Sequence, residues 1–272
     1  MERIKYTWKT ANVVYETPDT VTIVFDTANQ PFSYKAGQFI NLSLVVDGKT
    51  VSRSYSLSSA PTIDKQPSIT VKKIDGGLIS TYILLNAKKI REWTVEGPRG
   101  RFYPSDDVLL SEHIVLLAGG SGITPIFSMI KFLLHRTSSR LTLIFSTRNW
   151  EQTIFRDQLL KLETTFQNRF KIYFFVTGVP PHEPHNRASV YTGRPSRIVL
   201  KKIFKQAGFL QHGIRYFLCG PEELIKKAEE ALDDLNIDEQ SIYKEHFNPA
   251  TTSQQFQYPE QTFEVLFHFN EQ

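Results

Sequence analysis

The stretch from Ile114 to Pro125 constrains the fold of this chain more than any other part of its sequence. The apolar run at 114–118 predicts a strand that is buried on both faces of a parallel sheet. A glycine cluster follows, where the backbone can turn sharply and approach a ligand without a Cβ in the way. A helix then begins, with Thr124 suited to cap it and Pro125 suited to its first position. Free N–H groups at such a helix start bind phosphate, so a nucleotide is the first ligand to consider.

The glycine spacing leaves a second interpretation open. Pro125 stands where the third glycine of the common G-x-G-x-x-G pattern would be. The same residues would also suit a turn that only connects a strand to a helix. The remaining motifs have to decide between the two interpretations.

The two halves of the chain differ in the pattern of their apolar residues and turn signals. Up to about residue 100, runs rich in β-branched and aromatic residues are separated by turn signals, which predicts a small antiparallel β-barrel. From about residue 112, apolar strands alternate with amphipathic helices, which predicts a doubly wound, Rossmann-like α/β domain. We therefore expect a barrel domain at 1–108, an α/β domain at 109–247, and a linker with one further strand at 248–272.

The expected elements follow from these patterns. In the barrel they are the strands Val21–Phe25, Gln38–Val46, Val51–Leu57 and Ser68–Ile74 and the helix Leu78–Leu85. In the α/β domain they are the strands Ile114–Ala118, Leu141–Thr147, Phe170–Thr177, Ile214–Cys219 and Ser241–Phe247 and the helices Pro125–His135, Phe155–Phe166, Pro195–Gln206 and Pro221–Leu235. Residues 178–195 are expected to form a long loop. Its two histidines, His182 and His185, have no acidic or thiol partners nearby in sequence, so a solvated loop is favoured over a metal site.

Composition excludes several classes of function. With 272 residues, 40% hydrophobic and 22% charged, the chain is an ordinary globular protein long enough for two domains. The net charge of +4 comes without a Lys/Arg run that could track a nucleic acid. No apolar stretch could span a membrane and the polar N-terminus does not resemble a secretion signal, so we expect a cytoplasmic protein without a membrane partner. Cys219 is the single cysteine, which excludes internal disulfides, zinc fingers and a Cys-ligated iron–sulfur cluster.

The predicted barrel carries Arg53-Ser54-Tyr55-Ser56 on one strand. Strand alternation places Arg53 and Tyr55 on one face and the two serines on the other. The guanidinium fork matches a pyrophosphate, and the tyrosine ring offers a flat surface for stacking. Taken alone, the motif also suits an ordinary strand with an exposed arginine.

Two further motifs bear on the ligand. The segment 71–81 places Gly76 and Gly77 before a helix whose first turn carries Ser80 and Thr81, so amides and hydroxyls can converge on an anion. Cys219-Gly220-Pro221 follows a late parallel strand, at the sheet edge where doubly wound domains bind ligands. Each of these motifs is weak or moderate when taken alone.

The order of the four motifs resembles the ferredoxin–NADP reductase superfamily of flavoenzymes. The chain is most similar to reductase components such as that of phenylacetyl-CoA oxygenase and to flavohaemoglobin-type reductase modules. The likeness covers about residues 5–247. It implies FAD in the barrel, with FMN as an alternative, and a nicotinamide dinucleotide in the α/β domain.

The resemblance also implies roles for individual residues. Ser56, Cys219 and Glu245 would lie at the reacting centre. Arg53, Ser54, Tyr55, Ser56 and Phe247 would contact the flavin. Its pyrophosphate would be bound by the segment that includes Val71, Lys73, Gly76, Gly77, Leu78, Ile79, Ser80 and Thr81. The dinucleotide would be bound by Gly120, Ser121, Gly122, Ile123, Thr124, Cys219, Gly220 and Pro221. No residue is assigned to a metal.

The choice between NADPH and NADH depends on the end of the strand Leu141–Thr147. An acidic residue there would accept a hydrogen bond from a ribose hydroxyl, whereas arginine accommodates a 2′-phosphate. The sequence has Ser146, Thr147 and Arg148, with no acid before Glu151, and Arg194 in a later loop can add a second contact. We therefore expect NADPH, with NADH as the alternative.

The resemblance implies an oxidoreductase that passes a hydride from the dinucleotide to FAD and then single electrons to an acceptor such as a [2Fe–2S] centre or an oxygenase. A flavin- or nucleotide-binding module without turnover, acting as a sensor or assembly subunit, is the alternative. Relatives among oxygenase reductases continue into a [2Fe–2S] ferredoxin domain with four cysteines. Here the sequence ends at Gln272 without them, and Phe263–Phe269 resembles that domain's first strand, so we expect either a shortened chain or one that has lost the cluster domain.

Overall fold

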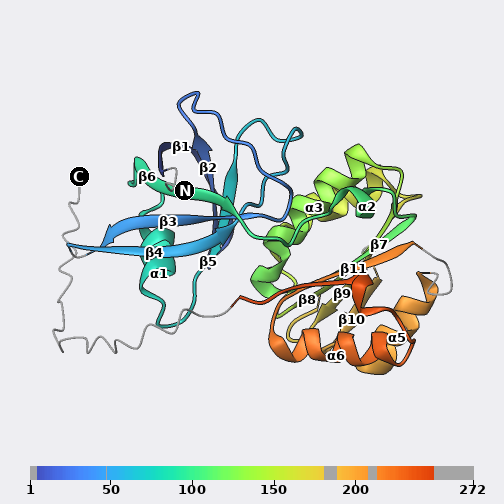
Figure 1. Cartoon of the computed structure of the whole chain (residues 1–272). Coiled ribbons are helices and arrows are strands. Elements are labelled where there is room, and N and C mark those ends of the chain that lie inside the picture. The colour runs from blue at the N-terminus through green and yellow to red at the C-terminus, as the bar shows by residue number, and fades with distance from the viewer. Residues whose placement is uncertain (1–4, 47, 181–188, 208–212, 248–272) are drawn as a thin grey trace.

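The computed structural model describes residues 5–46, 48–180, 189–207 and 213–247. Two sheets, each with its own core, lie side by side (Figure 1). The predicted strand at 248–272 lies outside the described residues, as do His182 and His185.

The first sheet is antiparallel, with the strand order β4-β3-β6-β1-β2-β5. It curls until the chain after β4 meets β5 through an antiparallel bridge between Leu57 and Ile69. The inward-facing aromatic rings of Trp8, Phe25 and Trp93 pack in a row, with ring centroids 5.3 and 5.8 Å apart. Its elements are β1 (Lys5–Thr17), β2 (Thr20–Asp26), β3 (Phe39–Val46), β4 (Lys49–Ser56), β5 (Ser68–Lys72), α1 (Leu78–Asn86) and β6 (Glu92–Arg99).

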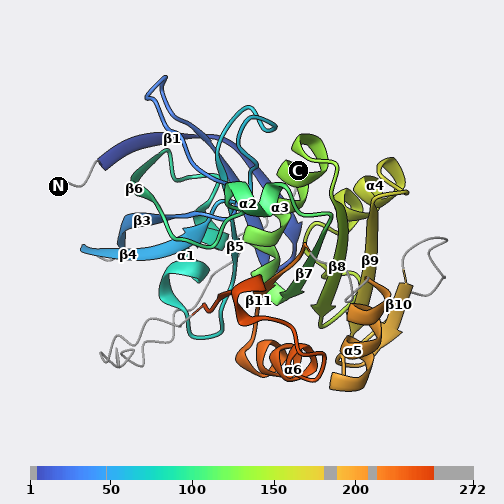
Figure 2. The ribbon, with the colours of Figure 1, turned by 45° about the vertical axis from the view of Figure 1, so that its right-hand side comes forward.

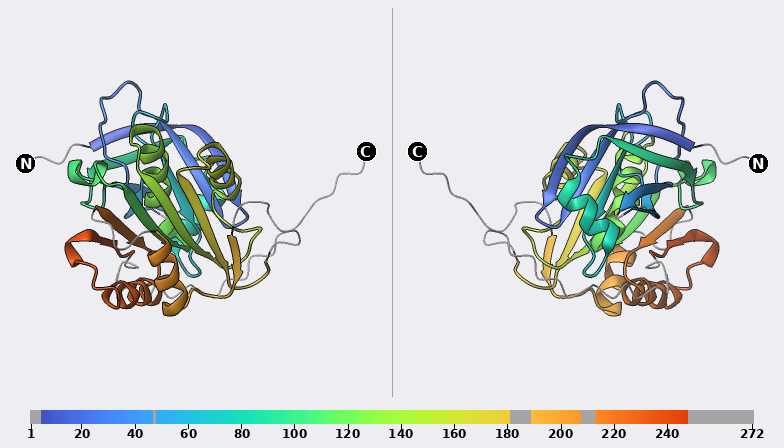
Figure 3. Two further views of the ribbon diagram at one scale, coloured as in Figure 1. Left: turned by 90° about the vertical axis from the view of Figure 1, so that its right-hand side faces the viewer. Right: turned by 90° about the vertical axis from the view of Figure 1, so that its left-hand side faces the viewer.

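The second sheet is parallel, with the order β10-β9-β8-β7-β11-β12. Helices α3 and α4 cover one face, and α5 and α6 cover the other (Figures 2 and 3). Its elements are α2 (Asp106–Leu109), β7 (His113–Gly119), the 3₁₀ turn η1 (Gly120–Gly122), α3 (Ile123–Arg136), β8 (Arg140–Thr147), α4 (Arg156–Thr165), β9 (Phe170–Val176), β10 (Ser189–Thr192), α5 (Arg197–Gln206), β11 (Ile214–Cys219), α6 (Glu222–Asp233), η2 (Glu239–Ser241) and β12 (Ile242–Glu245).

Strand β7 shows why its sequence is continuously apolar. Ile114, Leu116 and Ala118 belong to the core under α3, whereas Val115 and Leu117 belong to the core under α5 and α6. Both faces of the strand are therefore buried, as the sequence predicted. The predicted fold class, an antiparallel flavin-type barrel followed by a doubly wound α/β domain, is confirmed.

The structure corrects several local predictions. Strands β1 and β6 and the short helix α2 had not been predicted, and part of the expected loop at 178–195 forms the edge strand β10. Helix α3 begins at Ile123, earlier than predicted, and Thr124 is not its cap, because Gly122 holds that position. Pro125 lies within the first helical turn, where its missing N–H would have had no partner in the helix anyway.

Candidate functional site

Two of the predicted motifs meet at the point where the strand order of the parallel sheet reverses. Strands β7 and β11 are neighbours, but the chain leaves β7 toward β8 on one side and leaves β11 toward β12 on the other. A Cβ on Gly122 would lie 2.3 Å from the carbonyl oxygen of Cys219, and one on Gly119 would lie 2.6 Å from Cδ of Pro221. Only glycines let the two turns pack this closely, and the crevice at such a switch point is where open α/β sheets bind ligands.

The start of α3 is open to a ligand. Gly120 has a φ of 54°, and no atom of the residues that the structure describes lies within 4 Å of where its Cβ would be. No side chain caps the helix, and the Thr124 hydroxyl donates back to the carbonyl oxygen of Ser121 at 2.9 Å. Ile123 is fully buried, and its N–H donates back to the carbonyl oxygens of Gly120 and Ser121. The part of this helix start that an anion can reach is therefore the backbone of Gly120 and Ser121, which are both partly exposed.

A cleft of about 470 Å³ lies between the barrel and the carboxyl edge of the parallel sheet. The barrel contributes Asp19, Lys72, Lys73 and Asp75, and the α/β domain contributes Gly119, Gly120, Ser146, Arg148, Arg194, Pro221, Glu223 and Lys227, among others. Five of the lining residues are cationic and three are acidic, which suits an anionic ligand. Lys72, Glu223 and Lys227 had not been predicted. Glu223 and Lys227 are four residues apart on α6, directly after Pro221, so they share a helix face. This spacing is the sequence signal that could have predicted both of them as cleft residues.

The end of β8 lines this cleft with Ser146, Thr147 and Arg148. Arg148 is exposed and Ser146 is partly exposed, so both can reach a ligand. Thr147 is buried, and its hydroxyl contacts the Asn149 carbonyl oxygen at 3.5 Å, so it holds its own loop. Arg194 reaches the cleft from the segment after β10 and forms an ion pair of 2.8 Å with Glu223. Any phosphate that Arg194 binds has to compete with that carboxylate.

Strand β4 presents the arginine–tyrosine motif as the alternation predicted. Arg53 and Tyr55 are both half-buried on one face, and burial raises the pKa of the Tyr55 phenol, so the phenol stays protonated. Ser54 lies on the other face and donates to the side-chain carbonyl oxygen of Asn41 at 2.8 Å. Ser56 is buried at the end of the strand, opposite Phe39.

In the segment at 71–81, the groups that can contact a ligand are backbone groups and the side chains of exposed residues. Gly76 has a φ of 72°, and Lys73 lines the cleft. The Ser80 hydroxyl accepts from the Ile74 N–H at 3.1 Å, so it closes the turn that starts α1. The remaining predicted residues divide by exposure: Gly76 and Leu78 are exposed, Gly77 and Thr81 are partly exposed, and Val71 and Ile79 are buried in the barrel core, where their side chains cannot reach a ligand.

Cys219 and Glu245 are paired neighbours on strands β11 and β12. Burial, and then the Glu245 charge, raise the pKa of the Cys219 thiol well above its ordinary value, so the thiol is neutral and is not a nucleophile. Burial also raises the pKa of Glu245 to about 7, and its Oε2 atom is buried without a hydrogen-bond partner among the described residues. An orphaned buried carboxylate oxygen indicates a missing ligand group or proton. Phe247, two residues on, is 42% exposed.

Within the described ranges, no helix is long and apolar enough to cross a membrane. The same part of the chain contains no group of three or more His, Cys, Asp or Glu side chains that could hold a metal ion.

Comparison with known proteins agrees with this geometry. Residues 10–103 match the oxidoreductase FAD-binding domain, and residues 116–230 match the oxidoreductase NAD-binding domain. Fold and site thus define a two-domain oxidoreductase with one domain for each nucleotide. The chain carries an oxidoreductase FAD-binding domain followed by an oxidoreductase NAD-binding domain, as the four motifs predicted, and it shares its fold with a ferredoxin NADP+ reductase.

Curated relatives include the glycine betaine monooxygenase reductase subunit of Pseudomonas aeruginosa, which is 32% identical over 247 residues. That alignment covers 88% of this chain but 63% of the relative, so the chain spans less than two thirds of the relative's length. The flavohemoprotein of Deinococcus radiodurans is 30% identical over 80% of this chain and 52% of its own length.

Solved structures show the same fold. An Amycolatopsis cytochrome P450 reductase superposes with a TM-score of 0.75 at 21% identity, over 92% of this chain and 72% of its own. A ferredoxin NADP+ reductase from Neisseria gonorrhoeae with bound FAD and NADP superposes with a TM-score of 0.70 at 21% identity, over 90% of this chain and 99% of its own.

Proposed function

We propose that this chain is an NAD(P)H-dependent flavoprotein reductase that delivers electrons singly to an iron–sulfur centre or another one-electron acceptor. The observation that carries the proposal is the cleft. It joins Lys72 and Lys73 of the barrel to Gly120 and Arg148 of the α/β domain, so one elongated anion can contact both domains. Relatives that are named as reductase components of monooxygenases support the same function.

The residues present fit an FAD. Arg53 and Tyr55 share a face of β4, and the Gly76 turn leaves open space where a side chain would stand. Arg53 would neutralise the pyrophosphate, Tyr55 would stack on the ring system, and the uncapped start of α1 would add backbone N–H groups. Bound FAD supplies the redox chemistry, accepting a hydride from the reduced dinucleotide and releasing electrons one at a time.

The protein's own residues position the dinucleotide and manage one proton. The N-terminus of α3 binds its pyrophosphate. The Cys219 thiol is fully buried and neutral, so it would support the turn at Gly220 and Pro221 beside the nicotinamide without adding charge. Glu245, with a pKa near 7, can hold a proton on its carboxyl group at physiological pH and exchange it as the redox state changes. Arg148 and Arg194 favour NADPH over NADH.

The finer points belong to the same proposal. These are the division of the chain at 108/109 and 247/248, an oxygenase or a [2Fe–2S] protein as acceptor, the absence of a nucleic-acid or membrane partner, and a cytoplasmic location. The alternative, a binding module without turnover, would use the same two sites but would not reduce its flavin.

An anaerobic absorbance titration tests the proposal. The purified protein should show a flavin spectrum, and excess NADPH should bleach it, with NADH acting more slowly. Extracted flavin should be FAD. A bound flavin that neither dinucleotide bleaches would leave the binding module as the function, and a protein that takes up no flavin would overturn both.

A further inference from the structure

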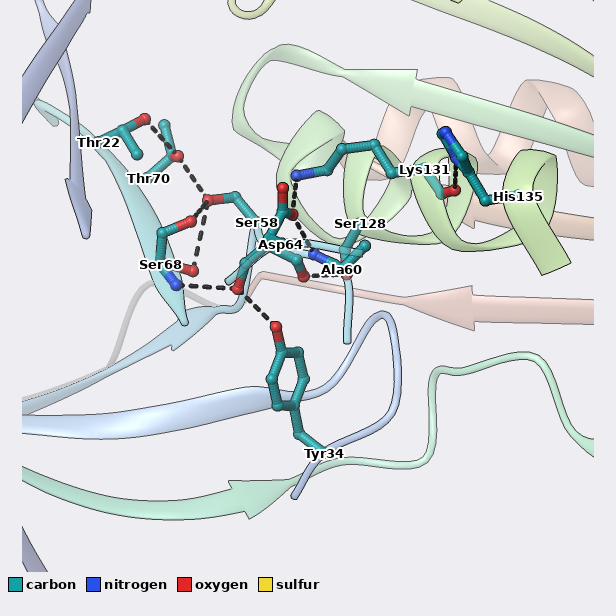
Figure 4. Close-up of polar contacts among 11 residues, drawn as sticks. Thr22, Tyr34, Ser58, Ala60, Asp64, Ser68, Thr70, Ser128, Lys131 and His135 are labelled. Atoms are coloured by element: carbon teal, nitrogen blue, oxygen red, sulfur yellow. Dashed lines mark hydrogen bonds and ion pairs between the residues drawn. The ribbon is translucent and has the colours of Figure 1, made fainter. Parts of the chain in front are cut away.

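Polar side chains of α3 contact the 57–64 loop of the barrel, which follows β4 directly (Figure 4). The Ser128 hydroxyl donates to the Ser59 carbonyl oxygen at 2.5 Å, and the Lys131 ammonium pairs with the Asp64 carboxylate at 2.5 Å. One turn further on, the Arg136 guanidinium donates to the hydroxyl of Thr62 at 3.1 Å. The contacts form a row along α3 and join the two domains.

The central contact is a shielded ion pair. The Lys131 side chain is 16% exposed and that of Asp64 is 35% exposed. Burial lowers the pKa of Lys131, while the Asp64 charge opposes that shift, as does Glu16 more weakly. The ammonium also lies 4.6 Å from the Phe127 ring centroid. A pair that is shielded mainly on its lysine side adds little net stability. The shielded ammonium is costly when left alone, so the geometry that pairs it is preferred.

The 57–64 loop is itself hydrogen-bonded to the barrel. A contact between α3 and this loop therefore fixes α3 relative to the barrel. The Asp64 carboxylate accepts from the Ala60 N–H at 2.6 Å. The Ser59 hydroxyl contacts the Tyr34 hydroxyl at 2.7 Å and accepts from the Ser68 N–H at 2.8 Å. Figure 4 shows this network continuing through Ser58 toward β2 and β5.

Both partners of the Ser128–Ser59 contact lie close in the chain to residues of the proposed site. Ser59 is three residues after Ser56, at the end of the flavin-type motif on β4. Ser128 is one helical turn, about 6 Å of rise, after Thr124 at the dinucleotide end of α3. Met129, also on α3, lies so close to the barrel that a Cβ on Gly37 would stand 2.3 Å from the Met129 Cε.

We propose that Ser128, Lys131 and Asp64 are positioning residues, which fix the dinucleotide-binding end of α3 against the flavin-binding strand and so set the approach of the two reacting rings. The proposal rests on the reductase function proposed above. Transfer between bound groups requires reacting atoms held about 3–3.5 Å apart, and a misplacement of about 1 Å can cost on the order of 100-fold in rate. Because none of the three residues lines the cleft, their loss should affect the transfer step and not ligand affinity.

The test uses the flavin-loaded protein and the variants Lys131→Met, Asp64→Asn and Ser128→Ala. Anaerobic stopped-flow gives the rate of flavin reduction at saturating NADPH, titration gives the dissociation constant for NADP+, and absorbance gives the flavin content. Hydrogen exchange of the backbone amides at 59–64 reports the loop independently of turnover. The matched control is Lys201→Met, which removes a pair of 3.3 Å with Asp234 inside the α/β domain.

Lys131→Met and Asp64→Asn should reduce flavin at least tenfold more slowly, with faster exchange at 59–64 but flavin content and NADP+ affinity within twofold of the parent. Lys131→Arg should recover at least a third of the parental rate, and Lys201→Met should keep it. If Lys131→Met fails to fold, Ser128→Ala carries the test, with an expected slowing of threefold or more. Parental reduction rates in the folded variants would overturn the positioning role alone, whereas a parent that neither dinucleotide reduces would overturn it together with the proposed function.

Discussion

Replacing Gly122 by alanine perturbs the contact on which the proposed dinucleotide site depends. Gly122 has a φ of −61°, so alanine brings no backbone strain there and acts through space alone. Its Cβ would lie 2.3 Å from the carbonyl oxygen of Cys219, 2.6 Å from its carbonyl carbon and 2.9 Å from the Gly220 nitrogen. All three are backbone atoms, which cannot rotate away. Restoring ordinary contact at 3.4 Å requires the start of α3 to separate from the end of β11 by about 1 Å.

Two magnitudes follow from that displacement. Overpacking a well-packed contact costs about 1–3 kcal/mol of stability. A shift of about 1 Å between the dinucleotide-binding and nicotinamide-bordering turns should slow flavin reduction on the order of 100-fold. The flavin should stay bound, because its predicted ligands lie in the barrel.

Stopped-flow reduction at saturating NADPH, a thermal melt and the flavin content measure these effects. Gly48→Ala is the matched control: Gly48 has a φ of 73° and stands in the β3–β4 hairpin, and among the described residues no atom lies within 4 Å of its Cβ position. Backbone strain should cost that variant about 1–2 kcal/mol, with no change in reduction rate. If Gly122→Ala, folded and flavin-bound, reduces its flavin within twofold of the parental rate, the reasoning from this contact is refuted.

Four further substitutions test the site. Arg53→Ala should weaken flavin retention by about 1.5–3 kcal/mol through loss of charge-assisted hydrogen bonds, measured as the dissociation constant for added FAD. Arg148→Ala should raise the Michaelis constant for NADPH far more than that for NADH, and equal effects on both would contradict its assignment. Cys219→Ser should slow flavin reduction without releasing flavin, and an unchanged rate in stopped-flow would remove Cys219 from the site. Glu245 has a pKa raised from 4.5 to about 7, so the folded state holds a proton that the unfolded chain has released. The stability that this proton provides, up to about 3 kcal/mol, is complete below pH 4.5 and is lost as the pH rises through 7, so Glu245→Gln should flatten that decline in urea unfolding of the flavin-free protein.

The α/β half of the fold could be predicted because its signals are local. Strand β7 is apolar on both faces and α3 has one clear apolar side, so period and composition agree. Strands β1 and β6 had no such signal. The burial pattern of β1 is mostly exposed and partly exposed, and β6 contains Gly97 and Pro98, residues that usually argue against a strand. Tertiary pairing with each other decided their conformation.

The sequence could predict which backbone segments come together at the candidate site, but not the direction in which side chains point. The glycines at 119–122 and Cys219 converge because the topology places β7 beside β11. Local pattern cannot show that the Ser80 hydroxyl is already used in its own turn or that Val71 points into the barrel core. Nor could it show that Glu223 would pair with Arg194 across the cleft, since the two residues lie 29 positions apart in the chain.

The close packing of Met129 against Gly37 has a consequence for protein engineering. Helix α3 belongs to the α/β domain in sequence and packs in its core, yet it also contacts the barrel. A chimera that exchanged the barrel for that of a relative at the 108/109 junction would bring a foreign residue to position 37 and foreign partners to Lys131. Any residue other than glycine at 37 would force the Met129 side chain to move and would also meet the Phe102 carbonyl oxygen, 2.3 Å from the Cβ position. The part of this protein that can be exchanged is therefore defined by the contact surface between the domains and not by one position in the chain. A working chimera must keep residues 36–38 and 59–64 together with the α3 residues that contact them.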